Sequence, residues 1–237
     1  QLTGAELVAD KWNLSREDLD QFALESHQKA AHATESQYFD REILPVEGKN
    51  AEGINDLVMA DEGIRFDASL DKLAGLNPVT EGGKITAGNA SQITDGAAAV
   101  LICNDAGLKK IKSNPRAEIV SISVVGDDPV FMLTGPIPAS HKALDIAKLS
   151  IEDMDIYEVN EAFAPVPLAW AEELKADRSK LNVNGGAMAL GHPLGATGAK
   201  LMTTMLHELE RREGNYALQA ICEGGGTANA TIIKRIT

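Results

Sequence analysis

Apolar positions recur at helical spacing close to the N-terminus. Ser15 precedes them, with Asp18 three residues later, which is the arrangement of a helix N-cap and capping box. Apolar residues spaced along residues 19–33 then predict a helix that runs to about residue 36. Over residues 40–94 the pattern is mixed, with short helical stretches and glycine turns. We predict an elaborated loop region here, without a core of its own.

Beyond Pro115 the chain becomes more regular. Short apolar runs alternate with amphipathic segments, which predicts strands and helices in the order βαβαβαββ. The predicted strands are residues 119–125, 155–159, 181–184, 217–222 and 228–235. The predicted helices are residues 140–149, 161–174 and 197–212. This order predicts an α/β fold with a mixed five-stranded sheet, helices on both faces and right-handed crossovers.

One further apolar run precedes this regular part. The stretch AAAVLIC at residues 97–103 has the pattern of a buried strand, and residues 106–112 have that of a short helix. Cys103, the last residue of this predicted strand, is expected in the core. Asn114 precedes Pro115, and a residue in that position resists helical geometry. We therefore place a domain boundary at residues 114–115.

A glycine-rich loop, NGGAMALGHPLGATG, occupies residues 184–198 between a predicted strand and a predicted helix. Gly186 and Gly191 have the spacing of a phosphate-binding P-loop, but His192 and Pro193 stand where that motif needs lysine and a hydroxyl residue. A nucleoside triphosphate is therefore not expected. Either the glycines form a tight turn for helix packing, or they let the backbone approach a ligand that His192 faces. A histidine there can hydrogen-bond a carbonyl oxygen or move a proton near neutral pH.

Cys222 ends a predicted strand and is followed closely by three glycines, at residues 224–226. A cysteine in this position is commonly a small buried hydrophobe. The glycine run can also turn successive N–H groups toward one point, as in an oxyanion hole, and a thiol beside such donors suits acyl transfer. Asn160, the glycine-rich loop and Cys222 all follow predicted strands, where α/β sheets bind ligands.

Composition narrows the class of protein. The chain has 237 residues, 44% of them hydrophobic, which suits a globular protein of one large or two smaller domains. Its formal charge of −13 argues against a nucleic-acid partner. No apolar run approaches the roughly 20 residues of a membrane span, so we expect a soluble, cytoplasmic protein. Two distant cysteines, Cys103 and Cys222, indicate a reducing compartment and no disulfide scaffold or metal site.

Several short motifs carry a resemblance to a known family. They are NEAFA at residues 160–164, GHPLGATG at 191–198 and CEGGG at 222–226, with GNASQITDGA at 88–97, DPVFMLTGPIPAS at 128–140 and SRE at 15–17 in support. Together they resemble the thiolases, which comprise acetyl-CoA acetyltransferases and 3-ketoacyl-CoA thiolases. The resemblance extends over essentially the whole chain. It implies a thiolase-like fold, acyl-CoA and coenzyme A as substrates, and no cofactor.

The resemblance implies roles for four catalytic residues. His192, together with a water held by Asn160, would bind the thioester oxygen, and His192 would also help to activate a nucleophilic cysteine. Cys222 would be the acid/base that moves the α-proton of acetyl-CoA. The backbone N–H of Gly224 would contribute to a second oxyanion hole.

Four more positions match the family's substrate contacts. Arg65 and Ser91 match residues that touch coenzyme A, and Met132 and Phe163 match the lining of the acyl pocket. By residue type alone, Arg65 also suits a surface charge, and Met132 and Phe163 suit a core.

The chain departs from the family pattern in one respect. Thiolases carry the acylated cysteine in an N-terminal half, and by the family's layout that cysteine precedes Gln1. Residues 1–93 would be the α/β loop domain, residues 94–115 the last strand and helix of the N-terminal half, and residues 116–237 the C-terminal thiolase domain. The predicted strand at residues 97–103 would then lack its sheet partners.

The expected function is therefore that of an acyl-CoA C-acyltransferase. It would cleave a 3-ketoacyl-CoA by thiolysis, or run the reverse Claisen condensation, through an acyl-cysteine intermediate. The 237-residue chain is expected to be inactive alone, and the complete protein to form a homodimer or homotetramer. Two alternatives remain from the residues: a non-catalytic, acyl-CoA-binding fragment, and a Cys–His hydrolase acylated on Cys222 itself.

Overall fold

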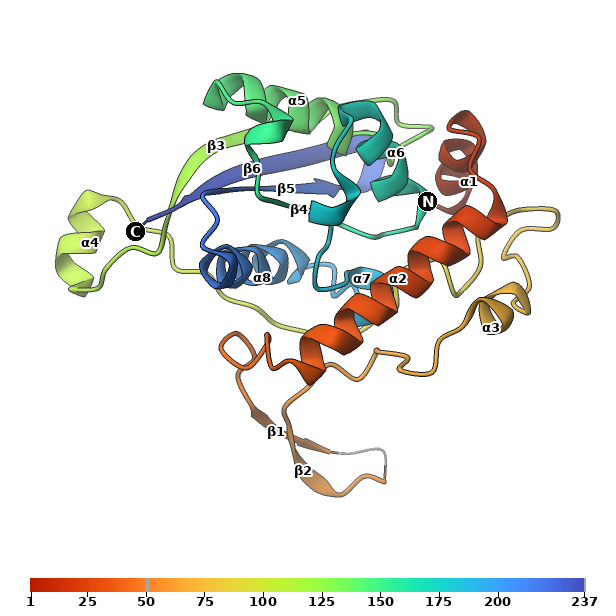
Figure 1. The fold of residues 1–237 in the computed structure, drawn as a ribbon, viewed down its shortest axis with the longest axis horizontal. Helices are drawn as coiled ribbons and strands as arrows, with labels where there is room; N and C mark the ends of the chain where they lie inside the picture. The colour runs from red at the N-terminus through yellow and green to blue at the C-terminus, as the bar shows by residue number, and fades with distance from the viewer. Residues whose placement is uncertain (50–51, 237) are drawn as a thin grey trace.

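A four-stranded mixed sheet lies at the centre of the computed structural model, which describes residues 1–49 and 52–236 (Figure 1). Its strand order is β3-β6-β5-β4. The strands are β3 (Ala117–Gly126), β4 (Ile156–Val159), β5 (Tyr216–Cys222) and β6 (Thr227–Arg235). The β4 and β5 strands are parallel, whereas β6 runs antiparallel to both β5 and β3. The mixed sheet is thus confirmed.

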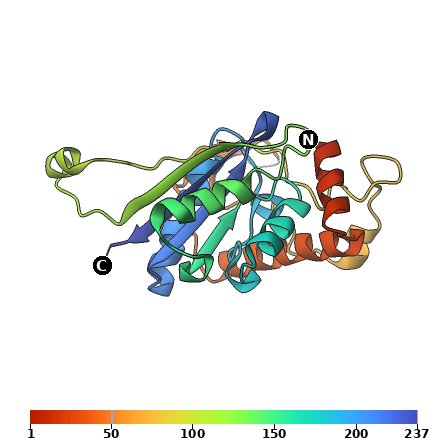
Figure 2. The same cartoon turned by 90° about the horizontal axis from the view of Figure 1, so that it is seen from above.

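Helices cover both faces of this sheet, as predicted (Figures 1 and 2). On one face α5 (Pro136–Ala147) contacts β3, β5 and β6, and α6 (Pro165–Leu174) packs beside it. On the other face α8 (Thr197–Arg212) contacts β4, β5 and β6. Side chains alternate accordingly along β5: Leu218 joins the core under α5, and Ala217 joins Met205 under α8.

The N-terminal region packs against the same core. It contains α1 (Leu2–Lys11), α2 (Arg16–Glu35), the hairpin strands β1 (Val46–Lys49) and β2 (Asn55–Val58), and α3 (Leu70–Ala74). Val8 of α1 and Phe22 of α2 belong to one hydrophobic cluster with Trp170 of α6. The Ser15 capping box is present, since Ser15 Oγ accepts from Asp18 N and Asp18 accepts from Ser15 N. These observations confirm the predicted helix. Buried residues of the predicted loop region pack into clusters shared with other parts of the chain, as Leu73 and Ile85 do with Phe22.

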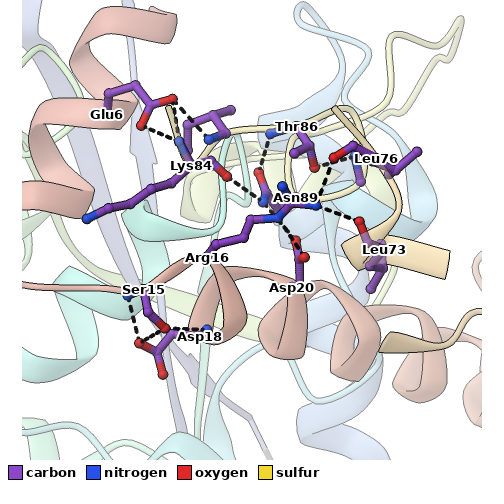
Figure 3. A network of polar contacts seen from close by, with 12 residues as sticks. Glu6, Ser15, Arg16, Asp18, Asp20, Leu73, Leu76, Lys84, Thr86 and Asn89 are labelled. Carbon is purple, nitrogen blue, oxygen red and sulfur yellow. Dashed lines mark hydrogen bonds and ion pairs between the residues drawn. The ribbon is translucent and has the colours of Figure 1, made fainter. Parts of the chain in front are cut away.

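A polar network fixes the segment that leads into the centre of the molecule (Figure 3). The Asn89 amide donates to Asp20 Oδ1 at 2.9 Å and to the Lys84 carbonyl at 3.1 Å, and Asn89 Oδ1 accepts from Thr86 N at 2.9 Å. Asp20 is in turn held by Arg16 at 2.6 Å. Arg16 and Asp20 lie on α2, so the network fixes residues 84–89 against that helix. Ser91 and Gln92, which follow this segment closely, are thereby held in place.

The predicted strand at residues 97–103 is wrong. This stretch pairs with no strand among the described residues, and Leu101 and Ile102 are 76% and 67% exposed. Cys103, expected in the core, is exposed as well. An apolar run becomes a strand only where neighbouring strands accept its backbone hydrogen bonds, and here none lies alongside. The short helix that follows is confirmed as α4 (Asp105–Ile111).

The fifth predicted strand, residues 181–184, is reduced to two isolated bridges, one between Leu181 and Tyr157 of β4 and one between Val183 and Gly185. Asn182 explains this, because it has a positive φ of 44° that interrupts extended backbone. Its carboxamide replaces the missing ladder: Oδ1 accepts from Val159 N and Nδ2 donates to Val159 O, both at 2.9 Å. The residues lie beside β4 as predicted, held by these side-chain bonds and by one backbone bond from Asn182 N to the Tyr157 carbonyl at 2.9 Å.

Two predicted helix starts are also wrong. The α5 helix begins at Pro136, four residues before the predicted start, and α6 begins at Pro165, four residues after it. Proline occupies the first turn in both, where its lack of an N–H is harmless. The shorter elements are α7 (Ala187–Leu190), η1 (Ile151–Asp153), η2 (Arg178–Lys180) and η3 (Gly224–Gly226). No helix in the described part of the chain is both long and apolar enough to span a bilayer.

Candidate active site

A cavity of about 260 Å³ opens where β4 and β5 end. Six of the eight sequence-predicted site residues line it: Ser91, Met132, Phe163, His192, Cys222 and Gly224. They come from five separate parts of the chain, and the fold brings them together at the carboxyl ends of two parallel strands. Asn160 lies directly behind His192, whereas Arg65 does not line this cavity.

His192 is held from both sides. Its backbone N–H donates to the Gln92 carbonyl at 3.0 Å, and its Nδ1 lies 2.7 Å from Thr197 Oγ1. The Thr197 hydroxyl donates its own hydrogen to the Pro193 carbonyl at 3.1 Å, so it accepts from Nδ1–H. In the neutral ring Nε2 is then the atom with a free lone pair. Burial lowers the pKa of His192, which keeps the ring neutral near pH 7.

Asn160 is the partner of that lone pair. It follows β4, is 1% exposed, and its backbone N–H donates to the Ala220 carbonyl at 3.0 Å. Its amide Nδ2 lies 3.4 Å from His192 Nε2. The side-chain Oδ1 is buried and accepts from no described residue. Asn160 thus holds the imidazole and carries a carboxamide oxygen that can hold a water.

Cys222 occupies the end of β5, opposite Ala228 of β6. It is 9% exposed, and burial raises the pKa of its thiol to about 12. In the described chain its sulfur makes no hydrogen bond to His192. Nucleophilic cysteines need a lowered pKa, usually from a positive neighbour or a histidine. This thiol therefore favours proton transfer over nucleophilic attack.

The glycines after Cys222 form the turn between β5 and β6. Gly225 and Gly226 have φ values of 75° and 82°, which other residues rarely adopt. At Gly226 a Cβ would also lie 2.8 Å from the Asp127 carbonyl. Gly224 has neither constraint, since a Cβ there would meet nothing within 4 Å. The turn thus leaves the backbone of Gly224 open on the cavity side.

Ser91 and Phe163 are placed by one short antiparallel contact. Ala90 forms a bridge with Phe163, Ser91 N donates to the Ala162 carbonyl at 3.0 Å, and Ala164 N donates to the Asn89 carbonyl at 2.9 Å. The polar network around Asn89 therefore orders this wall of the cavity.

Met132 lies in the loop between β3 and α5 and forms another part of the cavity wall. It has a φ of 58°, unusual for a side chain of this size. Its backbone N–H donates to the Asp128 carbonyl at 2.8 Å, which closes a turn before α5. Such backbone conformations concentrate at functional sites.

Arg65 lies apart from this group. Its side chain is exposed, and its backbone N–H donates to His27 Nδ1 at 3.1 Å. Its predicted contact with coenzyme A stays a prediction.

Sequence reasoning missed Gln92. Its Nε2 donates to the Gly63 carbonyl at 2.8 Å and to the Met188 carbonyl at 2.7 Å, while its own carbonyl holds His192. It thus ties the glycine-rich loop to the N-terminal region. Its partners are backbone groups 29 and 96 residues away, so no local pattern indicates this role.

Glu161 lies in the NEAFA motif and has no sequence-predicted role, but the structure indicates one. Its buried carboxylate accepts from Ser26 Oγ at 2.7 Å, Asn182 Nδ2 at 2.9 Å and Met188 N at 3.1 Å. Gly186 must be glycine, because a Cβ there would lie 2.2 Å from this carboxyl group. Burial raises the pKa of Glu161, against these hydrogen bonds. The residue anchors the loop that carries His192.

Together these features define the class. A neutral imidazole, a buried protonated thiol and the glycine at position 224 line one cavity in an α/β fold. This combination suits acyl transfer with proton movement between carbon and sulfur. Within the described residues no cluster of histidine, cysteine or carboxylate side chains has the geometry of a metal site.

Comparison with known proteins defines the family. Residues 3–106 match the thiolase N-terminal domain and residues 113–235 match the thiolase C-terminal domain. The chain belongs to the thiolase family. It is 56% identical over its whole length to the steroid 3-ketoacyl-CoA thiolase FadA6 of Mycobacterium tuberculosis, and 46% identical over 97% of its length to the human mitochondrial 3-ketoacyl-CoA thiolase.

Solved structures agree in fold. The chain matches the crystal structure of human mitochondrial 3-ketoacyl-CoA thiolase with a TM-score of 0.95 at 45% identity, over 99% of this chain and 59% of that one. A Bacillus anthracis acetyl-CoA acetyltransferase gives 0.94 at 41% identity, over 99% and 60% of the two chains. A structure of the human enzyme in complex with CoA also matches, covered to 58%. The chain spans 56% and 58% of the two sequence relatives named above.

Proposed function

We propose that this chain provides the acid/base and oxyanion-binding part of an acyl-CoA C-acyltransferase of the 3-ketoacyl-CoA thiolase type. The observation that carries the proposal is the single cavity lined by His192, Cys222 and Gly224. In it the thiol is protonated and the imidazole is neutral, which is the starting state that thiolysis of a 3-ketoacyl-CoA requires. The relatives named above include 3-ketoacyl-CoA thiolases and an acetyl-CoA acetyltransferase.

In the first half-reaction a cysteine thiol loses its proton to His192 Nε2 and its sulfur attacks the keto carbon of the substrate. The bond between the α-carbon and the keto carbon then breaks, which leaves an acyl-cysteine and the enolate of acetyl-CoA. The new Nε2–H, with a water on Asn160, stabilises the enolate oxygen. The Cys222 thiol gives its proton to the enolate carbon, which produces acetyl-CoA.

In the second half-reaction coenzyme A enters as a thiol. The Cys222 thiolate takes the proton of the incoming thiol, and the resulting coenzyme A thiolate attacks the acyl-cysteine. The backbone N–H of Gly224 stabilises the oxyanion of this tetrahedral intermediate. The leaving cysteine recovers its proton from His192, so each group returns to its starting state. Claisen condensation runs the same steps in reverse.

The acylated cysteine belongs to a segment outside these 237 residues. Both cysteines of the chain are poor candidates: burial raises the pKa of Cys222, and Cys103 lies on the exposed stretch that pairs with no described strand. The same segment provides strands for residues 97–103, and thereby covers Leu101 and Ile102.

Substrate contacts follow from the walls of the cavity. Ser91 contacts coenzyme A, whose presence in a human relative supports the ligand class, and Met132 and Phe163 line the acyl pocket. Arg65 contacts coenzyme A from outside this cavity, through its exposed side chain. The complete protein forms a homodimer or homotetramer, and the chain alone self-associates through its exposed apolar edge.

The chain alone is expected to show no thiolase activity, because it lacks the acyl carrier. Cleavage of acetoacetyl-CoA is measured with the 237-residue chain, with a separately produced N-terminal thiolase segment, and with both together. Activity only in the mixture supports the proposal. Robust cleavage by the chain alone contradicts it, since the nucleophile would then be Cys222 or Cys103.

A further inference from the structure

A row of buried polar side chains lies on the face of the sheet that α8 covers. Glu158 and Asn160 alternate with Tyr157 and Val159, which belong to the core under α5, so the first two point to the α8 face. Gln219 of β5 is the register partner of Glu158. Glu158, Asn160 and Gln219 are 1%, 1% and 4% exposed. They lie next to one another on this face as a polar row, and Asn160 at its end contacts His192.

This row contains too many hydrogen-bond acceptors for its donors. Both carboxyl oxygens of Glu158, Oδ1 of Asn160 and Oε1 of Gln219 accept from no described residue. Each amide nitrogen already uses one of its two hydrogens, since Asn160 Nδ2 lies 3.4 Å from His192 Nε2 and Gln219 Nε2 donates to Gly198 O at 3.2 Å, and the remaining hydrogens are fewer than these oxygens. An acceptor left without a donor in a buried site is destabilising. One additional hydrogen on Glu158 would provide a donor in the middle of the row.

The surrounding charges do not favour an ionised Glu158. Burial raises the pKa of Glu158 to about 8, and the attraction of Lys200 on α8, which lowers it, does not offset this. Glu208 on α8 is itself paired with Arg211 and Arg212. The other charged groups that act on Glu158 are Glu42, Glu161 and Lys29.

We propose that Glu158 is a neutral carboxylic acid in the folded protein and acts as a positioning residue. Its O–H completes the hydrogen bonding of the polar row, directly or through a water, and so fixes the Asn160 carboxamide against His192. The positioning role rests on the proposed function, because that function gives the Asn160–His192 pair its part in catalysis. Rising pH ionises Glu158, removes this donor and adds a buried negative charge, so His192 loses its fixed partner.

The test follows the ring nitrogens of His192 by NMR in the ¹⁵N-histidine-labelled chain as pH is raised. His192→Gln identifies the signal by its loss. We expect two steps: protonation of the ring itself on the acid side of the ordinary histidine pKa, and a second change near pH 8 as Glu158 ionises. Glu158→Gln mimics the neutral acid and is expected to abolish the second step alone. Lys200→Met removes the cation that favours ionisation and is expected to move that step to higher pH.

Glu172→Gln is the matched control, because Glu172 is exposed on α6, on the face of the sheet opposite α8. It is expected to keep both steps. A single step in the parent chain, or a second step that survives Glu158→Gln, overturns the proposal. If Glu158→Gln does not fold by circular dichroism, Lys200→Met decides: a step that moves upward supports the proposal, and one that stays or moves downward overturns it.

Turnover of the complete enzyme tests the positioning role separately. Glu158→Leu, which cannot donate, is expected to lower kcat by about 10- to 100-fold with little change in KM, the usual scale for groups behind catalytic residues. Glu158→Gln is expected to recover most of that loss and to remove the alkaline fall in rate. Normal turnover by Glu158→Leu overturns the positioning role. An inactive parent enzyme whose His192 still titrates in two steps counts against the proposed function and leaves the neutral acid supported.

Discussion

His192→Ala in the complete protein is expected to slow both half-reactions, each by about 10²- to 10³-fold, the usual cost of losing one oxyanion donor. The reason is that one nitrogen, Nε2, has two tasks: it takes the proton of the nucleophilic cysteine and then donates to the oxyanion. Nε2 is the unprotonated nitrogen of the neutral ring because the hydrogen is on Nδ1, where Thr197 accepts it. Single-turnover acylation and deacylation rates provide the measurement.

Two variants accompany His192→Ala. Asn160→Ala is expected to cost less, since Asn160 acts through a water that can partly persist after the amide is removed. His141→Ala, on the exposed side of α5, is expected to have no effect and controls for loss of a histidine as such. Near-normal thiolysis by His192→Ala would contradict the role assigned to His192.

Cys222→Ser is expected to slow condensation by about 10²- to 10⁴-fold and to leave acylation of the nucleophilic cysteine largely intact, because protonating the departing coenzyme A thiolate is far easier than removing an α-proton. A hydroxyl is far harder to deprotonate than a thiol, so the serine cannot take the α-proton of acetyl-CoA. Burial raises the pKa of the Cys222 thiol to about 12, so its thiolate is a strong base toward this α-proton. Condensation and acylation are measured separately in single turnovers.

Cys103→Ser is the matched control, because Cys103 is the other thiol of the chain and lies on an exposed stretch. It is expected to change neither rate. Equal losses of acylation and condensation in Cys222→Ser contradict the separate role of Cys222.

Elements with a strong local pattern could be predicted from the sequence. The α8 helix has the predicted ends, and β5 and β6 lie within a residue of theirs, because periodic apolar positions decide these elements locally. Residues 97–103 have an equally strong apolar pattern, yet a strand depends on partners elsewhere in the chain, and none of the described residues supplies them. Residues 181–184 failed for a different reason, since Asn182 replaces backbone pairing with its own side chain.

The position of the candidate site could be predicted from the motifs that follow predicted strands. Cys222 ends β5 and Asn160 follows β4, so the parallel pairing of these strands brings them to one edge of the sheet. The loop with His192 follows residues 181–184, which lie beside β4 although they form no strand. The residues that hold them could not be predicted in this way. Gln92 and Glu161 act through hydrogen bonds to groups that are distant in the sequence, and Glu158 is identified by carboxyl oxygens that have no hydrogen-bond donor among the described residues. Neither feature leaves a periodic pattern in the sequence.

The location of the acyl group tests the central claim most directly. The complete protein is incubated with acetyl-CoA, quenched, and its acetylated cysteine identified by mass spectrometry of the intact protein and its peptides. Our account predicts one acetyl group on a cysteine outside the 237 residues and none on Cys222 or Cys103. No adduct anywhere would support a non-catalytic, acyl-CoA-binding protein, and an acetyl group on Cys222 would contradict the account in favour of a Cys–His hydrolase.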